Sequence, residues 1–391
     1  MTEFYGYERP DGKIGIRNHL LVIAPIDCSY EPAKKIAEQV DGAVAITQTY
    51  GCGNDSMLVH NLAGTALNPN VAGVLIVGLG CETLTGEILV DKIKPSGKPV
   101  YNITIQEEGG TLKTHEKGVR ILQEMKQETA QLKKEPFPLS KLTLAVECGG
   151  SDATSGLAAN PAIGVAADKL LEEGGTVMFG ETQEMCGTQH VLARRAVNKE
   201  TADAIYEIIE TQEARQRAMG VDSRWMSKGN IDGGLTTIEE KSLGAVRKGG
   251  TKPIQGVLYN NWERFDTPTE PGLYLMDGPG WDVPSVTHMV AAGAQIVCFT
   301  SGRGSTTGHA IAPVIKITGN PRTFENMGDN MDINAGTILD GSESLNSVGK
   351  RIYDMIVQTA NGRQTKAEAL GYKDYIVFKR SREAEHLLGH C

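Results

Sequence analysis

Leu20-Leu21-Val22-Ile23-Ala24-Pro25-Ile26-Asp27-Cys28 is the stretch that decides the fold of this 391-residue chain. Its apolar run, Leu20–Ile26, is uninterrupted, which is typical of a strand buried on both faces of a parallel sheet. Helical spacing follows over Glu31–Val40, and apolar runs return at Ala43–Thr47 and Val71–Val77. Strands that alternate with helices through short turns indicate parallel βαβ units.

The same alternation continues along the chain. A fourth strand is expected at Val100–Ile105, and a long helix over Glu108–Lys133 is followed by a proline-containing linker up to Ser140. Gly229–Gly250 is rich in glycine and is expected to be irregular. Further strands are expected at Lys141–Val146, Thr176–Phe179, Leu273–Met276, Gln295–Thr300, Ala312–Ile317 and Asp374–Phe378.

These patterns predict an α/β protein of two Rossmann-like units with mostly parallel sheets. The expected N-terminal domain covers residues 1–135, and the expected C-terminal domain, a Rossmann variant, covers residues 141–391. A chain of this length exceeds one ordinary core, which also favours at least two domains.

Composition excludes several classes of protein. The net charge is -9, from 39 Lys and Arg against 48 Asp and Glu, and no basic run exceeds a pair, so nucleic acid is not an expected partner. No stretch of 18 apolar residues occurs, so no membrane span is expected. The start, Met1-Thr2-Glu3-Phe4-Tyr5, does not have the shape of a signal peptide. Seven cysteines without compact spacing then favour a cytoplasmic chain with free or metal-bound thiols.

Three cysteines follow three of the expected strands, each in a polar or glycine-rich turn. They are Cys28, Cys52 and Cys81. Because ligands bind at the carboxyl ends of parallel strands, these thiols are expected to converge at one edge of the sheet. In a reducing compartment, three converging thiols predict a metal or iron–sulfur site, although buried cysteines that act as small hydrophobes are the alternative. Cys148, after a further strand, is a fourth candidate ligand or a reactive thiol.

Other turns carry groups that suit an anionic substrate. Arg17-Asn18-His19 offers a cation, an amide and an imidazole just before the first strand of the sheet. Ser151 and Asp152, after Cys148, either hold a carboxylate at a helix start or are plain helix caps. The loop Gly302-Arg303-Gly304-Ser305-Thr306 combines close backbone approach with hydroxyl groups and a guanidinium.

Lys241 lies near the end of the glycine-rich stretch. Thr236 or Thr237 with Glu240 resembles a capping box just before it. Lys241 itself is a candidate for binding the substrate as a cation or for proton transfer.

Taken together, these motifs resemble those of the altronate/galactarate dehydratase family, which includes the large subunit of (2R)-sulfolactate sulfo-lyase. The resemblance extends in order from about residue 5 to residue 380. The motifs that carry it are Tyr7–Asn18, Tyr50-Gly51-Cys52, Gly78-Leu79-Gly80-Cys81-Glu82, Glu147–Asp152, Gly229–Gly244, Gly302-Arg303-Gly304 and Asp332–Gly336.

The resemblance implies a lyase that removes water or sulfite from the carbon beside a 2-hydroxycarboxylate, after which the enol becomes a 2-keto acid. It also implies iron, as Fe²⁺ or as an iron–sulfur cluster, bound by Cys28, Cys52, Cys81 and Cys148. The chain begins at the Tyr7-Glu8-Arg9-Pro10 motif without the family's SAF-type domain, so a separate small subunit of that type is the expected partner of a homo-oligomeric large chain. Gln189 stands where the dehydratases are expected to carry Glu.

The function that we predict from the sequence is an iron-dependent hydro-lyase acting on an altronate- or galactarate-type sugar acid. A sulfo-lyase that forms pyruvate and sulfite is the rival, and a nicotinamide dehydrogenase lacks its glycine fingerprint. A non-catalytic sugar-acid sensor is a further alternative, and the choice between a three-cysteine cluster and a mononuclear iron with mixed ligands stays open. The expected catalytic residues are Glu82, Lys241 and His19, and the expected substrate-binding residues are Arg17, Asn18, Ser151, Asp152, Gly302, Arg303, Gly304, Ser305 and Thr306.

Overall fold

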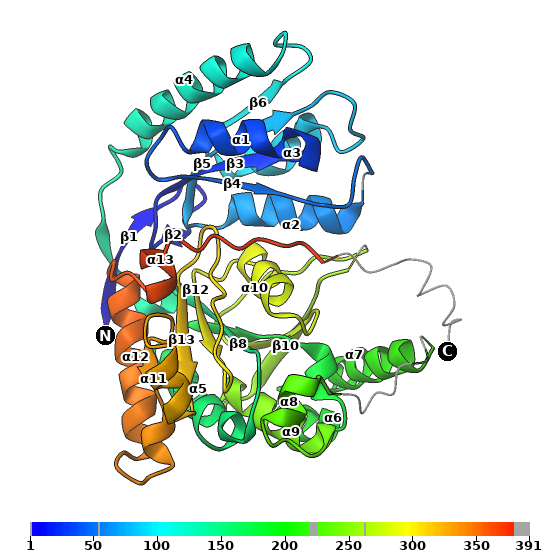
Figure 1. The fold of residues 1–391 in the computed structure, drawn as a ribbon, viewed down its shortest axis with the longest axis vertical. Helices are drawn as coiled ribbons and strands as arrows, with labels where there is room; N and C mark the ends of the chain where they lie inside the picture. Colours follow the sequence, from blue (N-terminus) through cyan, green and yellow to red (C-terminus); the bar gives the residue numbers. More distant parts are fainter. Residues whose placement is uncertain (1, 54, 219, 221–225, 262, 379–391) are drawn as a thin grey trace.

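The computed structural model describes residues 2–53, 55–218, 220, 226–261 and 263–378. They form two parallel β-sheets, flanked by helices and stacked one above the other, with a small antiparallel sheet at the side (Figure 1). The predicted fold class, an α/β protein with mostly parallel sheets, is therefore confirmed. No helix in the described part of the chain has both the length and the apolar character needed to span a bilayer.

The first sheet has four parallel strands in the order β4-β3-β5-β6. Every residue of its strand β5 is buried, as expected for a continuous apolar run between two helical layers. Helices α1 and α4 cover one face of the sheet, and α2 and α3 cover the other. The bounds are β3 His19–Ala24, β4 Ala43–Thr47, β5 Val71–Gly78, β6 Val100–Thr104, α1 Tyr30–Ala37, α2 Ser56–Leu67, α3 Gly86–Ile93 and α4 Thr111–Thr129.

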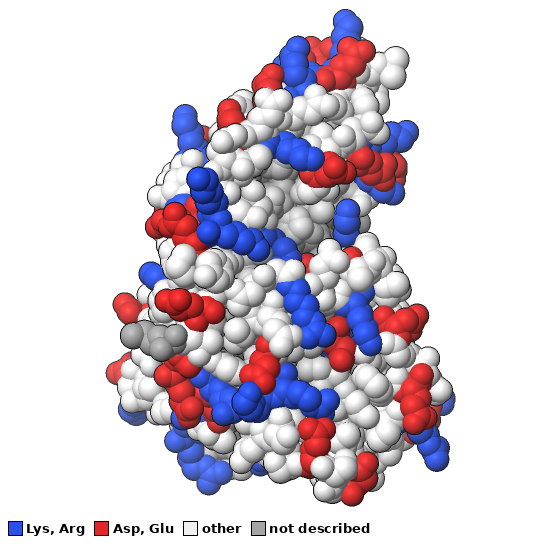
Figure 2. Space-filling view, turned by 90° about the vertical axis from the view of Figure 1, so that its left-hand side faces the viewer, with Lys and Arg blue, Asp and Glu red and all other residues white. Residues whose placement is uncertain are grey.

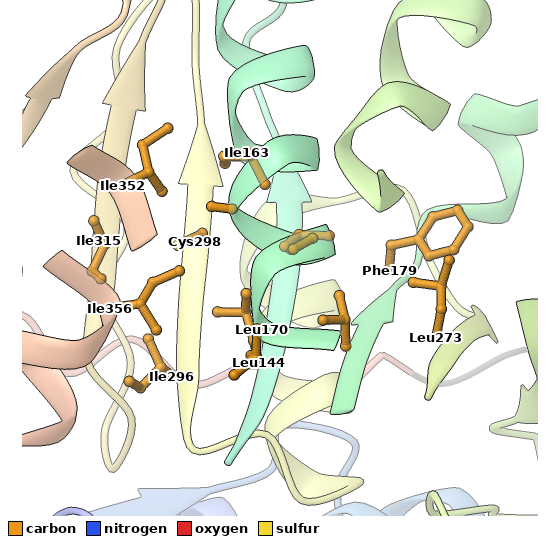
Figure 3. Packing of buried hydrophobic residues seen from close by; sticks show 14 of the residues in the cluster. Leu144, Ile163, Leu170, Phe179, Leu273, Ile296, Cys298, Ile315, Ile352 and Ile356 are labelled. Carbon is orange, nitrogen blue, oxygen red and sulfur yellow. The ribbon is translucent and has the colours of Figure 1, made fainter. Parts of the chain in front are cut away.

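The second sheet has seven parallel strands in the order β10-β11-β9-β8-β12-β13-β14. On one face, side chains such as Leu144 and Ile315 pack against α5 and α12, and Cys298 is a buried hydrophobe among them (Figure 3). The bounds are β8 Thr143–Cys148, β9 Thr176–Phe179, β10 Ile254–Tyr259, β11 Leu273–Asp277, β12 Ile296–Thr300, β13 Val314–Thr318, β14 Ile333–Asn334, α5 Asn160–Glu172 and α12 Leu345–Ala360.

The two sheets share one apolar layer. Helix α10 (Asp282–Ala291) covers the other face of the seven-stranded sheet and packs against α2 of the first half, so that Leu62 and Met289 belong to the same hydrophobic cluster. The predicted division near residues 135–141 falls between the two sheets and stays a prediction, because this shared core joins the halves.

The expected linker before Ser140 forms a short strand instead. Strand β7 (Glu135–Pro138) pairs antiparallel with β1 (Glu3–Glu8), whose other neighbour is β2 (Ile14–Gly15). Prolines are tolerated on an edge strand, where a missing N–H breaks no ladder. The pairing partner lies about 130 residues away in sequence, so local pattern did not reveal it.

Two other expectations are wrong. Asp374–Phe378 forms no strand: it is held by isolated bonds, such as the one that the Ile376 N–H donates to Thr287 Oγ1 (3.4 Å). The glycine-rich segment expected to be irregular contains helices α8 (Lys228–Asp232) and α9 (Ile238–Ala245). Its glycines serve close packing, since a Cβ on Gly244 would lie 2.9 Å from the Cα of Gly156.

One face of the molecule carries both basic and acidic side chains. On the face drawn in Figure 2, Lys and Arg side chains are interspersed with Asp and Glu. This agrees with the modest excess of acidic over basic residues in the sequence.

His309 makes folding stability depend on pH. It is 4% exposed and packs against the Tyr375 ring, with centroids 5.9 Å apart, and burial and then the nearby His19 lower its pKa to about 3. Because the folded pKa lies below the usual 6.5, the stability contribution is complete above pH 6.5 and is lost as the pH falls towards 3. We expect a loss of about 1.4 kcal/mol per pH unit from this group, measured by urea unfolding at neutral pH and at about pH 5. His309→Gln should flatten that dependence, and parallel stability curves for the two proteins would contradict the assignment.

Candidate active site

The three predicted cysteine turns lie at one edge of the four-stranded sheet. Cys28, Cys52 and Cys81 follow β3, β4 and β5, which are neighbouring strands, and all three thiols are free and exposed. The Thr83 N–H donates to the carbonyl of Cys52 (2.9 Å) and so links two of the turns. Desolvation, then Asp27 and the other two cysteines, raises the pKa of Cys28, so the three groups are close enough to interact electrostatically.

Glu82 shapes the third of these turns. Glu82 is 7% exposed. Its carboxylate accepts hydrogen bonds from the N–H groups of Leu79 (3.0 Å), Gly80 (2.7 Å) and Cys81 (3.0 Å). These contacts give Glu82 a role in positioning Cys81. Proton transfer by Glu82 stays a prediction.

Arg17, Asn18 and His19 lie at the amino end of β3, opposite the cysteines. Arg17 pairs with Glu368 of α13 (Lys366–Ala369) through Nε (2.7 Å) and Nη2 (3.0 Å). Asn18 donates to the carbonyl of Thr129 (3.1 Å), and burial, then Arg17, lowers the pKa of His19 to about 4. The structure does not bring these three residues to the other candidate site residues, and the contacts of Arg17 join the first half to the C-terminal helices.

A second set of polar residues gathers at the carboxyl edge of the seven-stranded sheet. The chain adds strands on opposite sides of the neighbouring pair β8 and β12, and such a reversal point is where α/β sheets bind ligands. The turns after these strands are hydrogen bonded: the Gly149 N–H donates to Thr300 O, and the Arg303 N–H donates to Gly150 O, both at 2.9 Å. The two predicted anion-binding turns therefore lie side by side.

The loop after β12 is held mainly by its own neighbours. Gly302 is glycine for steric reasons, since a Cβ there would lie 2.1 Å from the carboxylate of Asp152. Gly304 has a positive φ of 85°, the Ser305 hydroxyl bonds Thr307 (2.8 Å), and the carbonyl of Thr306 accepts from Lys316 Nζ (3.1 Å). Arg303 is exposed at the tip of the loop.

Asp152 acts as a cap. Its carboxylate accepts from the N–H of Thr154 (2.9 Å), the hydroxyl of Thr154 (2.6 Å) and the amide of Asn320 (3.0 Å). Ser151, by contrast, makes no such cap and is 5% exposed beside a pocket. The structure thus favours the capping interpretation for Asp152 and leaves Ser151 as a binding candidate.

The pocket has a volume of about 220 Å³ and lies between the turn after β8 and helix α9. Lys241, from α9, forms part of its wall and is only 7% exposed. The capping prediction near it is confirmed, since the Thr237 hydroxyl accepts from the Glu240 N–H (3.2 Å). The polar residues of the wall are Ser151, Asp152, Ser155, Asn160, Glu240, Lys241 and Arg247.

A buried ion network leads from Lys241 into the protein. The Lys241 ammonium pairs with Glu184, whose other carboxylate oxygen accepts from the Cys148 thiol (3.2 Å). The Lys248 ammonium donates to Cys148 Sγ (3.0 Å) and pairs with Glu181. Lys248 and Glu181 are both 0% exposed. The sequence did not single out Glu181, Glu184 or Lys248, although Glu181 stands two residues after a strand end, as the predicted site residues do.

Glu181 carries two signs of a functional site. Its φ is 73°, and it is the one non-glycine residue with positive φ among the described residues, a conformation that costs energy unless the surroundings impose it. Its Oε1 is buried without a hydrogen-bond partner, as is Oε1 of Glu147, whose Oε2 accepts from the Ser285 hydroxyl (2.8 Å). Unsatisfied buried oxygens of this kind are rare in proteins.

The network fixes the protonation states around the pocket. Burial alone would raise the pKa of Glu184, but the charges of Lys241 and Lys248 outweigh it and the pKa lies below its usual value. Burial would lower the pKa of Lys241, but Glu184, Cys148 and Glu181 raise it. Burial and Glu181 raise the pKa of Cys148 well above its usual value. Lys241 is therefore an ammonium, Glu184 a carboxylate and Cys148 a thiol near neutral pH.

Comparison with protein families gives two adjoining matches. Residues 6–130 match the second domain of D-galactarate dehydratase/altronate hydrolase, and residues 139–383 match the C-terminal domain of D-galactarate/altronate dehydratase. The chain belongs to the D-galactarate/altronate dehydratase family.

Individual members of this family confirm the predicted resemblance. The chain is 38% identical to the (2R)-sulfolactate sulfo-lyase subunit beta of Chromohalobacter salexigens, and the match covers 96% of each protein. It is 34% identical to galactarate dehydratase (L-threo-forming) of Escherichia coli, covering 92% of this chain and 73% of that one, and 30% identical to altronate dehydratase of Bacillus subtilis, covering 96% and 77%. These relatives are lyases by name, and the prediction of a lyase is confirmed.

The described residues of this chain include a group that can hold a metal ion. One ligand atom each of Cys148, Glu181 and Glu184 lies within 4.8 Å of the others. However, the ammonium groups of Lys248 and Lys241 contact these same side chains and already supply positive charge. The cysteine edge of the first sheet offers three exposed thiols, and thiolates are the donors that iron–sulfur clusters use.

Removal of the buried ammonium of Lys248 should destabilise the protein strongly. Lys248→Met leaves Glu181 and Glu147 buried without their counter-ion, so we expect a loss of about 3–5 kcal/mol in the free energy of urea unfolding. Adding Glu181→Gln should recover part of that loss. The control is Lys252→Met, which breaks a pair with Glu172 whose side chains are 37% and 60% exposed, and should change stability far less than Lys248→Met. Equal losses in the two single variants would contradict a central role for Lys248.

Proposed function

We propose that this protein is a lyase that eliminates a leaving group from carbon 3 of a small 2-hydroxycarboxylate, and that the leaving group is sulfite. The observation that carries the proposal is the buried Lys241 ammonium, paired with Glu184, at the wall of a pocket at the reversal point of the seven-stranded sheet. The 38% identity to a sulfolactate sulfo-lyase subunit over nearly the full length of both chains supports sulfite as the leaving group.

The charges of the pocket suit an anionic substrate. Of its acidic residues, Glu240 is bound by the N–H (2.8 Å) and hydroxyl (2.7 Å) of Thr236, and Asp152 is bound by the donors of its own cap. Lys241 and Arg247 are cations on the same wall. We propose that they bind the substrate carboxylate and the sulfonate, with the Ser151 hydroxyl as a further donor.

Lys241 also has the place and charge to assist the chemical step. Loss of the proton on carbon 2 of a hydroxy acid builds negative charge on the substrate carboxylate as an enediolate forms. A preorganised ammonium in a site of restricted solvent access stabilises such charge better than water does. Elimination then breaks the bond between carbon 3 and sulfur, sulfite leaves with the electron pair, and the enol becomes pyruvate.

A hydro-lyase that acts on a sugar acid is the second candidate. It is favoured by the relatives named galactarate dehydratase and altronate dehydratase, at 34% and 30% identity. The same carbon-2 proton would be removed, and water would replace sulfite as the product.

Product analysis separates these candidates. The purified protein, prepared under anaerobic conditions, is incubated with sulfolactate, altronate or galactarate, and sulfite and 2-keto acid are measured. We expect sulfite and pyruvate in equal amounts from sulfolactate, and a loss of both in Lys241→Met. A 2-keto-3-deoxy acid from altronate or galactarate without sulfite release from sulfolactate would establish the hydro-lyase instead. No product from any of the three acids would overturn the proposed function.

We propose that Cys28, Cys52 and Cys81 hold the iron that the family resemblance implies. Iron held by these thiols would supply Lewis-acid chemistry at that edge of the first sheet. Helix α9, which carries Lys241, lies at the end of the molecule away from the four-stranded sheet (Figure 1). The contributions derived above for Lys241, Arg247 and Ser151 therefore do not depend on this group.

Metal analysis tests the cysteine site. We expect iron with a matching amount of acid-labile sulfide in the anaerobically purified protein, and the loss of both in Cys52→Ser, because a cluster requires all its thiolates. Cys298→Ser, inside the hydrophobic core, is the matched control and should retain the iron. The contrary outcome is iron without sulfide, which is lost in Glu184→Gln but kept in Cys52→Ser. That outcome would assign the metal to Cys148, Glu181 and Glu184 instead.

The name of one relative bears on the partner of this chain. The relative named subunit beta belongs by name to an enzyme of several subunits, and we propose a separate small SAF-type subunit for this chain together with self-association of the large one. A cytoplasmic location would suit the free thiols of the described residues.

A further inference from the structure

We propose that Arg247 is a catalytic residue of the pocket: it binds the sulfonate and stabilises the negative charge that gathers on this group as sulfite leaves. The inference rests on the proposed function and adds the residue that acts on the leaving group. Its starting point is geometric, because Arg247 lines the pocket together with Lys241. The two cations come from successive elements of the chain, Lys241 from α9 and Arg247 from the turn Val246–Gly249.

Arg247 is the charged residue of the pocket wall whose side chain is not engaged by the protein. Lys241 is paired with Glu184, and Glu240 and Asp152 accept hydrogen bonds from neighbouring threonines. The guanidinium of Arg247, by contrast, makes no hydrogen bond or ion pair with any residue that the structure describes, and Arg247 is exposed. It can therefore bind an anionic group without first breaking an ion pair.

The backbone that carries Arg247 is fixed from three sides. The ammonium of the next residue, Lys248, enters the buried ion network, where it donates to Cys148 Sγ (3.0 Å). The Arg195 guanidinium donates to the carbonyl oxygen of Gly249 (3.0 Å). Helix α5 packs against the same turn, since a Cβ on Gly164 would lie 2.4 Å from the carbonyl oxygen of Arg247. An unengaged cation on a fixed backbone is a preorganised donor, which needs little rearrangement when charge develops beside it.

The pocket suits a small substrate with an anionic group at each end. Its volume of about 220 Å³ lies below the range of about 300–1,000 Å³ that is usual for sites of drug-sized ligands. Two wall residues, Leu157 and Leu243, are 68% and 50% exposed and lie at its mouth, whereas Lys241 is 7% exposed. Because Lys241 is assigned to the substrate carboxylate, the exposed Arg247 is the cation that remains for the sulfonate.

The chemistry of the step places a need for positive charge at the sulfonate. Loss of the carbon-2 proton, which passes to the solvent, leaves its electron pair on the enediolate. That pair forms the double bond between carbons 2 and 3 as the carbon–sulfur bond breaks, and the pair of the broken bond goes to sulfur. The sulfonate, a monoanion, thereby becomes the sulfite dianion. A solvent proton then adds to carbon 3 while the enol hydroxyl loses its own, which yields pyruvate.

A guanidinium matches this need better than it matches the departure of hydroxide. Its N–H groups form a planar fork that binds the oxygens of an anion in pairs. An arginine stays protonated in proteins, so it donates hydrogen bonds without giving up its proton. Hydroxide needs a proton or a metal ion as it leaves, whereas sulfite leaves as a stable anion. Arg247 therefore favours sulfite over water as the leaving group of this pocket.

Arg247→Met tests the assignment, because methionine keeps part of the length of the side chain and removes its charge. We expect kcat for sulfolactate to fall about 10²-fold, the lower end of the usual effect of losing one preorganised donor, since Arg247 is exposed. Arg247→Lys should recover part of that loss. Arg120→Met, which replaces an exposed arginine on α4 of the first half, is the matched control and should keep the wild-type kcat.

Exchange in D₂O distinguishes a residue that acts on the leaving group from a purely structural one. Each protein is incubated with sulfolactate in D₂O, and deuterium at carbon 2 of the remaining substrate is measured together with released sulfite. We expect Arg247→Met to raise the ratio of exchange to sulfite release, because proton loss continues while cleavage of the carbon–sulfur bond is slowed. Wild-type kcat in Arg247→Met, or a lower kcat with an unchanged ratio, would overturn the assignment. A wild-type protein that releases no sulfite from sulfolactate would instead overturn the proposed function, so the two failures are separable.

Discussion

The ammonium of Lys248 is the constraint on which the rest of the active-site region depends. It is fully buried and contacts both Cys148 and Glu181, which end or follow different strands of the seven-stranded sheet. A buried charge is tolerated only when its partners are in place, and removing one partner leaves an uncompensated charge. Folding must therefore bring together the ends of β8 and β9 and the turn Val246–Gly249, which carries Lys248. The turn that carries Glu184 follows β9, so its position depends on the same contacts.

The stacking of the two sheets determines how many sites the chain can offer. Each parallel sheet has its own carboxyl edge and its own reversal point, and ligands bind at such points. The first sheet presents three exposed thiols there, and the second presents a pocket with buried ion pairs. Because the sheets are joined by an apolar layer from α2 and α10, neither edge can turn towards the other within one chain without breaking that core. The exposed thiols and the pocket therefore lie at separate edges of the molecule.

Sequence patterns predicted the features that depend on residues close together in the chain, such as strands and the turns that follow them. Fully apolar runs such as Val71–Val77 predicted the strands, and the rule for strand ends predicted the cysteine edge and the position of Ser151. The pairing of β1 with β7 and the contacts of Lys248 with Glu181 and Cys148, 67 and 100 residues away, have no local signal. Arg17, Asn18 and His19 show a different limit. They precede a strand, so the same rule places them at the opposite edge from the cysteines, and rich polar chemistry alone was an insufficient reason to group them with the site.

Lys241 illustrates how an environment chooses between two chemically reasonable roles. From the sequence it was a candidate for either role, and we predicted it to be a catalytic residue. Glu184, Cys148 and Glu181 together raise its pKa against the effect of burial, so it stays protonated and cannot serve as the base in the resting state. The structure therefore favours the interpretation of Lys241 as a substrate-binding cation. Neighbouring groups with opposed pKa shifts are the usual means by which enzymes separate the cation from the base.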